Sequence, residues 1–405
     1  MTRMLLVVCL LLGADRVCGG EHSFPHGSEW PVQTGLPSLL RDPEGAKIET
    51  ASAWWRQREY LKALVTEMHY GSVPDRPSAA DTQFEVTLRE DIFDGRGERV
   101  FFVVTIQQNE KELPVRGVLF RPKTNPNRAA IVKNDAFLTD YEGIKDARKR
   151  AKYIEQDRLG TERRIFQEAL ERGYLVCKFL REDVAGDKTA RSDGGIFALY
   201  PEEFTWGVIA AWAWAGSVIA DVLVREFNVA PTRLVATGHS RGGKTALCQG
   251  IFDERIAVTV PSASGSGGTG SWRFFTEGGA QQTPAAMERG HARWFTSRLY
   301  EFSGREDRLP FDGHTFKALI APRALLNTQG REDSLANPVG TEATFRSAQQ
   351  VFKLLGVPDN QGLHWRPGQH EQSEQDWLAL LDFADWRLFG KRSSRPFQQL
   401  ITAEP

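Results

Sequence analysis

The sequence has no excess of charge of either sign. Its 405 residues include 51 Lys and Arg against 52 Asp and Glu, which gives a formal net charge of -1. A protein that follows a nucleic-acid backbone normally carries a surplus of basic residues. The balance of charge therefore argues against nucleic acid as a partner. Disorder is disfavoured as well, because hydrophobic residues make up 41% of the chain and aromatic residues 10%.

Cysteine is scarce, with four residues in the whole chain. Cys9 and Cys18 fall in an N-terminal segment that we expect to be removed, which leaves Cys177 and Cys248. In an exported protein these two thiols could pair, and two unpaired buried thiols are an equally open alternative. There is no CxxC motif and no spacing typical of a zinc site, so we expect no structural metal. We expect no cofactor either.

The apolar run at the N-terminus is too short to span a bilayer. Arg3 precedes an apolar stretch over residues 4–12, and small residues follow around positions 18–20. These features are typical of a secretory signal peptide over residues 1–20, and the alternative is a wrongly chosen start codon before a cytosolic protein. We therefore expect a secreted or periplasmic protein with no stable membrane span.

The rest of the chain shows two successive patterns. Alternating or β-branched runs separated by turns predict an antiparallel start to a sheet over residues 84–120. After that, buried-type strands alternate with helices, which indicates a mainly parallel sheet covered on both faces. No linker divides the chain, so residues 21–405 are predicted to form one domain. Later strands are predicted at 129–132, 175–179, 233–237, 256–260 and 324–328, and helices at 51–68, 142–172, 203–227, from 242, and at 373–388.

The sharpest motif is Gly-His-Ser-Arg-Gly at residues 238–242, which fits the pattern GxSxG. A buried-type strand precedes it, and a helix rich in small residues follows. In this context the turn holds the serine in a strained conformation, and the flanking glycines leave room for it. The start of the helix offers backbone N–H groups to a developing oxyanion. The motif therefore predicts that Ser240 is a nucleophile.

A serine nucleophile needs a base, and the base needs an orienting acid. In α/β-hydrolases the chain order is serine, acid, histidine. His370 lies in a loop just before the last predicted helix, where this fold delivers its base. Asp333 follows the strand predicted at 324–328 and is the favoured acid. The neighbouring Glu332 is a weaker candidate for the acid. Asp307 lies in a segment of similar sequence, but no buried strand directly precedes it, so it is a weaker candidate as well.

Other patterns favour structural interpretations. Residues 265–270 fit GxGxxG, but residues 271–275 are a poor start for the helix that a dinucleotide site needs. We therefore predict a close-packed loop beside the active site. His314, before a helix, is predicted to be structural, and His364, on a final strand, is predicted to be a packing or rim residue. Three of the eleven tryptophans lie on the helix predicted at 203–227, where core packing is favoured; Trp272 and Trp294 stay open.

At this point the chain resembles the glucuronoyl esterases, carbohydrate esterase family 15, and especially their bacterial members. The resemblance covers most of the chain after the N-terminal segment. The form Ser-Arg-x-Gly-Lys at residues 240–244 is far more specific than GxSxG. Asp221 and the Trp-Ala-Trp of residues 212–214 also look like family features. Further matching segments are residues 253–256, 264–268, 309–314, 318–323, 333–338 and 368–370.

The resemblance implies an α/β-hydrolase that cleaves esters between glucuronic acid on xylan and lignin alcohols. By this resemblance Ser240 is the nucleophile and His370 the base. Arg241 helps to bind the oxyanion through its backbone N–H and its guanidinium. Lys244 binds sugar hydroxyls, and Glu277 matches an acidic residue that also grips the sugar. Trp272 is a further candidate for substrate binding.

Two positions depart from the family pattern. Many members carry a catalytic Glu in the loop after the strand that follows the nucleophile helix, and that position is Ala263 here. The resemblance therefore leaves Asp333 as the acid, as in other members. A tryptophan that stacks on the glucuronate often lies two residues past this aspartate, and here that residue is Leu335.

These observations predict a two-step acyl transfer through Ser240, His370 and Asp333, carried out by a monomer on glucuronoxylan or a related carbohydrate ester. The loop at residues 134–137 is where the fold would place a second oxyanion donor. Two rival functions stay open. One is an acetyl-xylan or other carbohydrate acetyl esterase on the same fold, for which the residues at 263 and 335 leave room. The other is a carbohydrate-binding homologue without activity.

Overall fold

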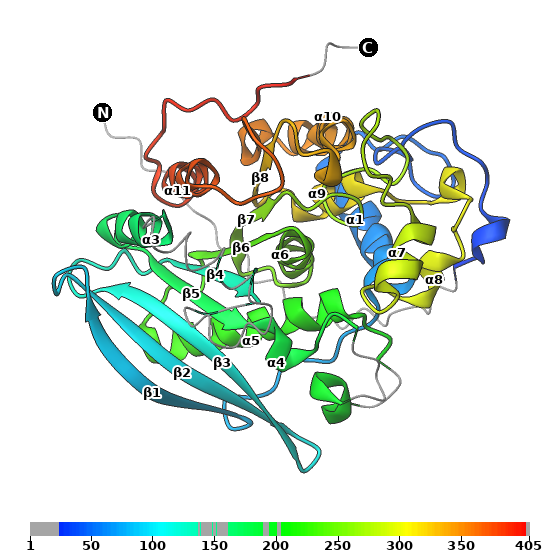
Figure 1. Cartoon of the computed structure of the whole chain (residues 1–405). Coiled ribbons are helices and arrows are strands. Elements are labelled where there is room, and N and C mark those ends of the chain that lie inside the picture. Colours follow the sequence, from blue (N-terminus) through cyan, green and yellow to red (C-terminus); the bar gives the residue numbers. More distant parts are fainter. Residues whose placement is uncertain are drawn as a thin grey trace, which may run out of the picture.

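A nine-stranded mixed sheet organises the molecule, with the strand order β1-β2-β3-β5-β4-β6-β7-β8-β9 (Figure 1). The computed structural model describes residues 24–136, 161–188, 194–200 and 204–401, together with positions 138, 148 and 151. The predicted signal peptide lies outside the described residues, and so does most of the first half of the helix predicted at 142–172.

The sheet begins with three long antiparallel strands. They are β1 (Thr82–Ile92), β2 (Gly97–Gln108) and β3 (Lys111–Pro122), and β3 pairs antiparallel with β5 (Leu175–Leu180). Every second residue of β2 from position 100 to position 106 is buried, which is the period-2 pattern of a strand with one face on the core. The predicted antiparallel start is therefore confirmed.

The remaining strands are parallel to one another and almost wholly buried. Their buried runs are apolar or β-branched, as expected for strands covered on both faces. The prediction of a mainly parallel sheet is confirmed, and the predicted strands end one to three residues later than predicted. They are β4 (Ala130–Asp135), β5, β6 (Leu234–His239), β7 (Ile256–Ser262), β8 (Ala324–Gly330) and β9 (Gln361–Arg366).

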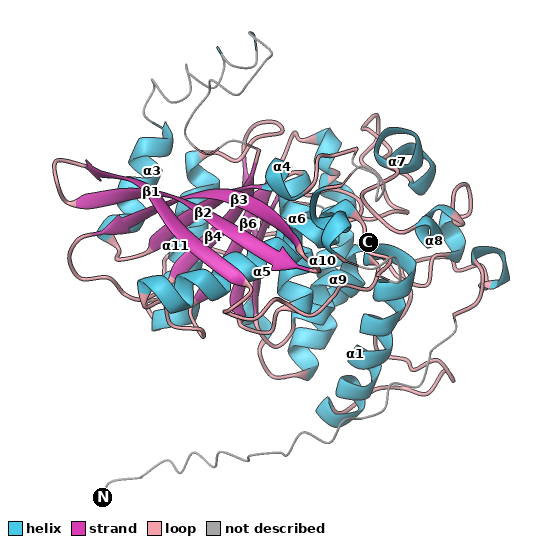
Figure 2. Ribbon diagram, turned by 90° about the horizontal axis from the view of Figure 1, so that it is seen from below, coloured by secondary structure: helices cyan, strands magenta, loops and turns pink. Residues whose placement is uncertain are grey.

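Helices cover both faces of the sheet (Figure 2). On one face, α3 (Thr161–Glu171) and α11 (Glu374–Phe389) enclose an apolar core with β4, β6, β7 and β8. A larger core lies on the other face and includes the buried tryptophans. Its helices are α1 (Ala51–Val65), which continues as a π-helical turn over Thr66–Tyr70, α5 (Val208–Phe227), α6 (Arg241–Phe252), α9 (Gly313–Ile320) and α10 (Pro338–Leu354); the short helices are α4 (Arg181–Val184), α7 (Pro284–His291) and α8 (Ser297–Tyr300).

Helix α5 is the apolar centre of the larger core. Within the described residues it is the one helix long and apolar enough to cross a membrane. Of its most apolar 18-residue stretch, 83% is buried inside the protein. It begins at Val208 rather than at residue 203, because Gly207 caps it and lies against the backbone of Trp294. Trp206, Trp212 and Trp214 are buried, which confirms their predicted role in packing.

Helix α10 was not predicted from the sequence. Its first turn contains Gly340 and Thr341, which have low intrinsic helix propensity. The start signal lies just before it: the side chain of Asn337 accepts a hydrogen bond from Gly340 N at 3.0 Å, and Pro338 occupies the first helical position. Tertiary packing against α9 then outweighs the weak local preference.

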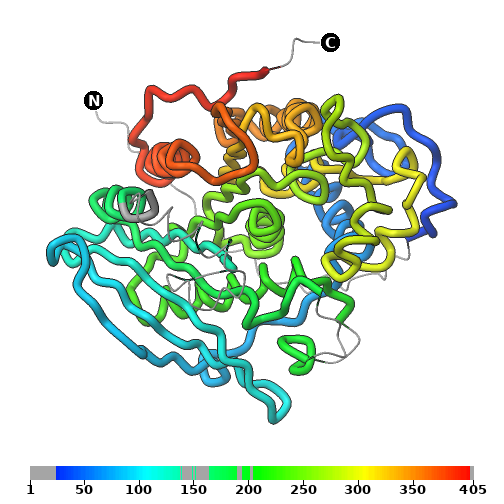
Figure 3. The backbone as a smooth tube through the Cα atoms, in the orientation of Figure 1, coloured from blue at the N-terminus to red at the C-terminus, as the bar shows by residue number. Residues whose placement is uncertain are grey.

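The N-terminal segment runs beside the part of the chain that contains α7 and α8 (Figure 3). Gly27 N donates to Glu301 at 2.7 Å, Gln33 N donates to the carbonyl of Asp307 at 2.9 Å, and Arg298 binds the carbonyl of Phe24 at 2.9 Å. These contacts fasten the N-terminal segment to α8 and to the loop that follows it, and α8 packs against α7.

Four buried histidines make the fold sensitive to acid. Burial lowers the pKa of His69 and His239 to about 3 and that of His314 and His364 to about 4. In the unfolded chain these groups take up protons below a pKa of about 6.5. Their contribution to stability is therefore complete above about pH 6.5 and is lost as the pH falls toward about 4.

We expect the free energy of unfolding to fall between pH 7 and pH 5 by an amount that reflects several histidines, each contributing up to about 1.4 kcal/mol per pH unit. Urea titrations monitored by tryptophan fluorescence measure this change. The variant His364→Gln should show a shallower dependence on pH than the parent chain, because one buried neutral imidazole is removed. Equal unfolding free energies at the two pH values would contradict the prediction.

Candidate active site

The turn between β6 and α6 holds Ser240 in a strained conformation. Its backbone has φ 57° and ψ -118°, in a region that residues other than glycine rarely occupy. A Cβ on Gly238 would overlap the carbonyl oxygen of Gly242, so the chain can cross itself this closely only with glycine. Ser240 N donates to the carbonyl of Ser262 on β7 at 2.9 Å. The predicted strand–turn–helix geometry is therefore confirmed.

Ser240, His370 and Asp333 form a continuous hydrogen-bonded chain. His370 Nε2 lies 2.9 Å from Ser240 Oγ, and His370 Nδ1 lies 2.8 Å from Asp333 Oδ2. The carboxylate is 1% exposed and its second oxygen accepts a hydrogen bond from Ala336 N at 3.0 Å. The side chain of His370 is 26% exposed and so remains open to a substrate. Strands β6, β8 and β9 deliver these residues to the same edge of the sheet.

The arrangement can move a proton from serine to histidine. Asp333 accepts from Nδ1, which leaves Nε2 as the atom that takes the proton from Ser240 Oγ. The buried carboxylate then stabilises the imidazolium that results. Such a set can carry out acyl transfer, with Oγ as the attacking atom.

The two weaker acid candidates do not reach the histidine. The side chain of Glu332 accepts a hydrogen bond from Gly368 N at 2.6 Å and so joins the acid loop to the histidine loop. Asp307 lies on the 3-10 turn Glu306–Arg308, whose backbone contacts the N-terminal segment. Only Asp333, among these three carboxylates, is within hydrogen-bond distance of His370.

A pocket opens directly in front of the serine. It is enclosed by the start of α6, the loop after β7, helix α7 with the residues that follow it, and the acid and histidine loops. Its lining combines charged, polar and apolar side chains. The lining residues are Ser240, Arg241, Lys244, Ala263, Ser264, Gly265, Gln282, Met287, His291, Trp294, Leu335 and His370.

Arg241 and Lys244 form the cationic wall of this pocket. The guanidinium of Arg241 is paired with Asp187 and lies 5.1 Å from the centre of the Trp294 ring. Lys244 is buried, and its ammonium donates to the carbonyls of Ser264 and Ser266. Burial and the nearby Arg241 lower the pKa of Lys244 to about 7. The Arg241 backbone N–H is at the first position of α6, where helix N–H groups have no partner within the helix.

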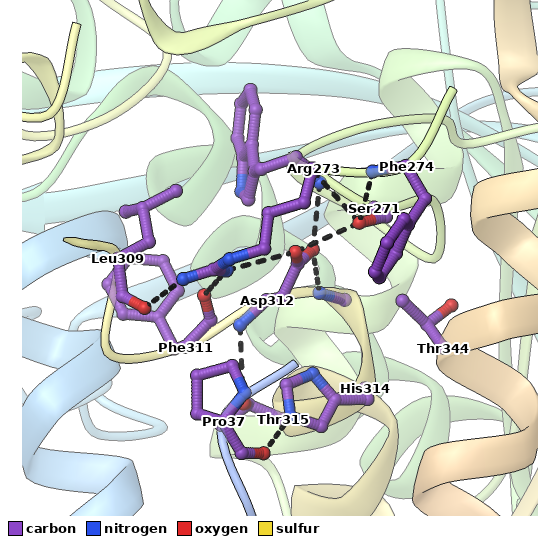
Figure 4. Close-up of polar contacts among 12 residues, drawn as sticks. Pro37, Ser271, Arg273, Phe274, Leu309, Phe311, Asp312, His314, Thr315 and Thr344 are labelled. Carbon is purple, nitrogen blue, oxygen red and sulfur yellow. Dashed lines mark hydrogen bonds and ion pairs between the residues drawn. The ribbon is translucent and has the colours of Figure 1, made fainter. Parts of the chain in front are cut away.

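The loop that supplies these carbonyls is anchored by a buried carboxylate. Asp312 is fully buried and accepts hydrogen bonds from Trp272 N at 2.8 Å and from Ser271 Oγ at 2.9 Å (Figure 4). Arg273 pairs with the same carboxylate at 3.2 Å. Residues 265–270, just before this anchor, are all buried and start no helix, which confirms the predicted close-packed loop.

Two of the predicted substrate-binding residues lie away from this pocket. Trp272 is fully buried and packs edge-on against Phe295 and His69, so its ring is part of the core. Glu277 is exposed and does not line the pocket. For Trp272 the reason is its position in the anchored loop, which turns the ring inward. Lys244 and Arg241, by contrast, do line the pocket.

Sequence reasoning missed the residues that α7 and its continuation bring to the pocket. Trp294 stacks on His291 with ring centres 3.9 Å apart. Burial and then Arg241 lower the pKa of His291, so this imidazole is neutral near pH 7. Gln282 presents a buried side-chain oxygen that has no hydrogen-bond partner among the described residues. A sequence signal existed in Thr283-Pro284, which caps α7.

Residues 134–136 of the loop predicted to supply a second oxyanion donor are among the described residues. Asn134 Nδ2 donates to the carbonyl of Gly242 at 3.1 Å, so this side chain supports the back of the elbow. Phe137 lies outside the described residues. In the described part of the chain, Cys177 and Cys248 are free, buried thiols, so of the two alternatives the unpaired one is confirmed and the disulfide is not formed. No group of three metal-ligating side chains was found among the described residues.

Comparison with known proteins gives a consistent picture. Residues 161–356 match a family model described as "Glucuronyl esterase, fungi". The chain is 34% identical over 370 residues to a 4-O-methyl-glucuronoyl methylesterase of Phanerochaete carnosa, covering 89% of this chain and 82% of the relative. It is similar in structure to a carbohydrate esterase family 15 glucuronoyl esterase of Caldicellulosiruptor kristjansonii, with a TM-score of 0.73, 29% identity and coverage of 93% and 96%.

A second solved structure, described as a promiscuous family 15 esterase from a marine bacterial metagenome, has a TM-score of 0.74 and 25% identity, with coverage of 89% of this chain and 98% of that one. These neighbours confirm the prediction of an α/β-hydrolase fold.

Replacing the acid should separate Asp333 from its neighbour. We expect Asp333→Asn to lower kcat for ester hydrolysis by about 10⁴-fold, because the amide favours the wrong imidazole tautomer. Glu332→Gln is the matched control, since it keeps a hydrogen-bond acceptor for Gly368 N and should cost less than tenfold. Steady-state kinetics with circular dichroism as a check of folding measure both. A larger loss in Glu332→Gln would show that the acid is misassigned.

Proposed function

The chain belongs to the glucuronoyl esterases, carbohydrate esterase family 15, and we propose that it hydrolyses glucuronate esters that link xylan to lignin alcohols. Membership makes it a carboxylic ester hydrolase. The observation that carries the finer proposal is the cationic wall of Arg241 and Lys244 beside Ser240. Such a wall suits an acyl group that bears sugar hydroxyls and becomes a free uronate when the reaction is complete.

The proposed reaction is a two-step acyl transfer. Ser240 Oγ attacks the ester carbonyl while His370 Nε2 takes the proton, and His370 then gives that proton to the leaving alcohol. Water, activated by the same imidazole, releases the uronate in the second step. Two hydrogen bonds support this assignment. His370 Nε2 lies 2.9 Å from Ser240 Oγ, where it can take the proton, and Nδ1 lies 2.8 Å from Asp333, which stabilises the imidazolium.

Arg241 is proposed to stabilise the tetrahedral oxyanion through its backbone N–H. Its guanidinium is held by Asp187 and by the ring of Trp294, which fixes a positive charge near the same point. A charge that is already oriented costs no reorganisation when the oxyanion forms. Lys244 is proposed to bind sugar hydroxyls in its protonated form, whose third N–H is left over after the two that bind loop carbonyls.

The alcohol side of the ester is proposed to leave past Leu335. This side chain is 40% exposed, lines the pocket, and offers an apolar surface without a ring that could stack on the sugar. Secretion or periplasmic export through residues 1–20, and action as a monomer, remain part of the proposal, because the substrate is a polymer outside the cell.

An acetyl esterase activity is the second candidate. The observation that favours it is the pair Ala263 and Leu335, two small or aliphatic side chains that contact the pocket and leave it without a stacking platform. A small acyl group would need no such platform.

Hydrolysis of benzyl glucuronate compared with 4-nitrophenyl acetate tests the substrate. We expect a higher kcat/KM for the uronate ester and loss of both activities by several powers of ten in Ser240→Ala, because the nucleophile is removed. A preference for acetate that still depends on Ser240 would keep the serine mechanism and move the substrate to the acetyl esters. Activity unchanged in Ser240→Ala would refute the mechanism.

A further inference from the structure

We propose that Arg366 is the positioning residue of the histidine loop, and that it sets the turnover of the enzyme through His370 without touching the substrate. The proposal rests on the serine mechanism above. Arg366 is the last residue of β9, four positions before His370, and its side chain is 1% exposed. It does not line the pocket.

All five N–H donors of the guanidinium are used, and four of them hold the histidine loop. The two Nη atoms donate to the backbone carbonyls of Pro367 at 3.0 Å, Gln369 at 3.1 Å and Glu371 at 2.6 Å, and to the Glu371 carboxylate at 3.1 Å. The carbonyls of residues 369 and 371 flank His370 on either side. The planar, fixed fork of arginine therefore fixes the backbone on both sides of the base.

The fifth donor connects this clamp to a helix. Nε lies 2.6 Å from Asp376 Oδ2, and that side chain is fully buried. The same carboxylate oxygen accepts Ser373 N at 2.8 Å in the cap that starts α11. The position of His370 is thereby fixed relative to β9, which ends at Arg366, and relative to α11, which begins at Glu374.

The geometry of the loop fits the clamp closely. Gly368 has φ +105°, and a Cβ there would lie 2.9 Å from Arg366 Nη1. A Cβ on Gly330, at the end of β8, would overlap the carbonyl oxygen of Gly368. The loop therefore packs closely between the end of β8 and the guanidinium. Glu332, next to the acid Asp333, accepts a hydrogen bond from Gly368 N.

Removing the charged Arg366 and Asp376 side chains from water costs free energy, which suggests that the pair has a role other than stability. Isolated buried ion pairs often contribute little net stability, because desolvation offsets their attraction. A lysine could neutralise Asp376, but it has one compact ammonium and cannot reach carbonyls on both sides of His370. The fork geometry matters for placing the imidazole, and a displacement of about 1 Å at a reacting group can cost about a hundredfold in rate.

The test is Arg366→Lys, with Arg58→Lys as the matched control. Arg58 is also a buried arginine; it lies on α1, away from the pocket, and is held by the Leu319 carbonyl and by the Glu254 carboxylate. With benzyl glucuronate, we expect Arg366→Lys to lower kcat about a hundredfold while KM stays within about twofold. Arg58→Lys should lower Tm to a similar extent and leave kcat within about twofold.

Labelling by a fluorophosphonate gives a second readout that does not depend on the sugar. Its rate at Ser240 should fall in Arg366→Lys by about the same factor as kcat. In Arg366→Ala, methylguanidinium in the buffer should restore part of kcat, whereas methylammonium should not. A merely structural role would produce neither the split between kcat and KM nor this selective rescue.

If Arg366→Lys does not yield folded protein, Asp376→Asn takes its place. It keeps an oxygen for Nε but removes the charge, so kcat should fall about tenfold with KM unchanged. A kcat within threefold of the parent enzyme in the folded variant, while Ser240→Ala abolishes hydrolysis, would overturn the inference and leave the proposed function intact. Hydrolysis that does not depend on Ser240 in the parent enzyme would instead overturn the proposed function.

Discussion

The close crossing of the chain at Gly238 and Gly242 is the constraint on which the rest of the site depends. It turns the chain from β6 into α6 with Ser240 at the apex, at φ 57°. A residue in such a conformation costs of the order of 1–3 kcal/mol, and it persists only when its surroundings over-determine it. Here they do, because Ser240 N is bound to β7, Asn134 holds the carbonyl of Gly242, and α6 is packed into the larger core.

The loops around the serine are held by buried charges rather than by apolar packing alone. Asp312 anchors the loop after β7, and Arg366 anchors the loop that carries His370. Each of these side chains saturates backbone donors or acceptors in a segment with no regular structure. Since loops lack the internal hydrogen bonds of helices and strands, their buried backbone groups must find side-chain partners. The same contacts that satisfy the backbone also fix where the reacting groups lie.

The central sheet and the nucleophile were accessible from sequence, because both depend on local patterns. Buried apolar runs of the right length predict the parallel strands, and GxSxG between a strand and a helix predicts the elbow. Chain order, together with the place of Asp333 after a predicted strand and of His370 before the last predicted helix, selected the acid and the base. In the structure Asp333 lies at hydrogen-bond distance from His370, and His370 from Ser240. Helix α10 was missed because its first turn is poor in helix formers and is stabilised by tertiary contacts.

The walls of the pocket could not be predicted in the same way, because they are set by long-range packing. Trp272 and Trp294 are separated by 22 positions and look alike in sequence, yet one is turned into the core by the Asp312 anchor and the other faces Arg241. What distinguishes them is the partner that each backbone segment finds: Trp272 N binds Asp312, whereas the carbonyl of Trp294 lies against Gly207 at the start of α5. Neither partner is close in sequence, so the orientation of each ring follows from the assembled fold and not from its local context.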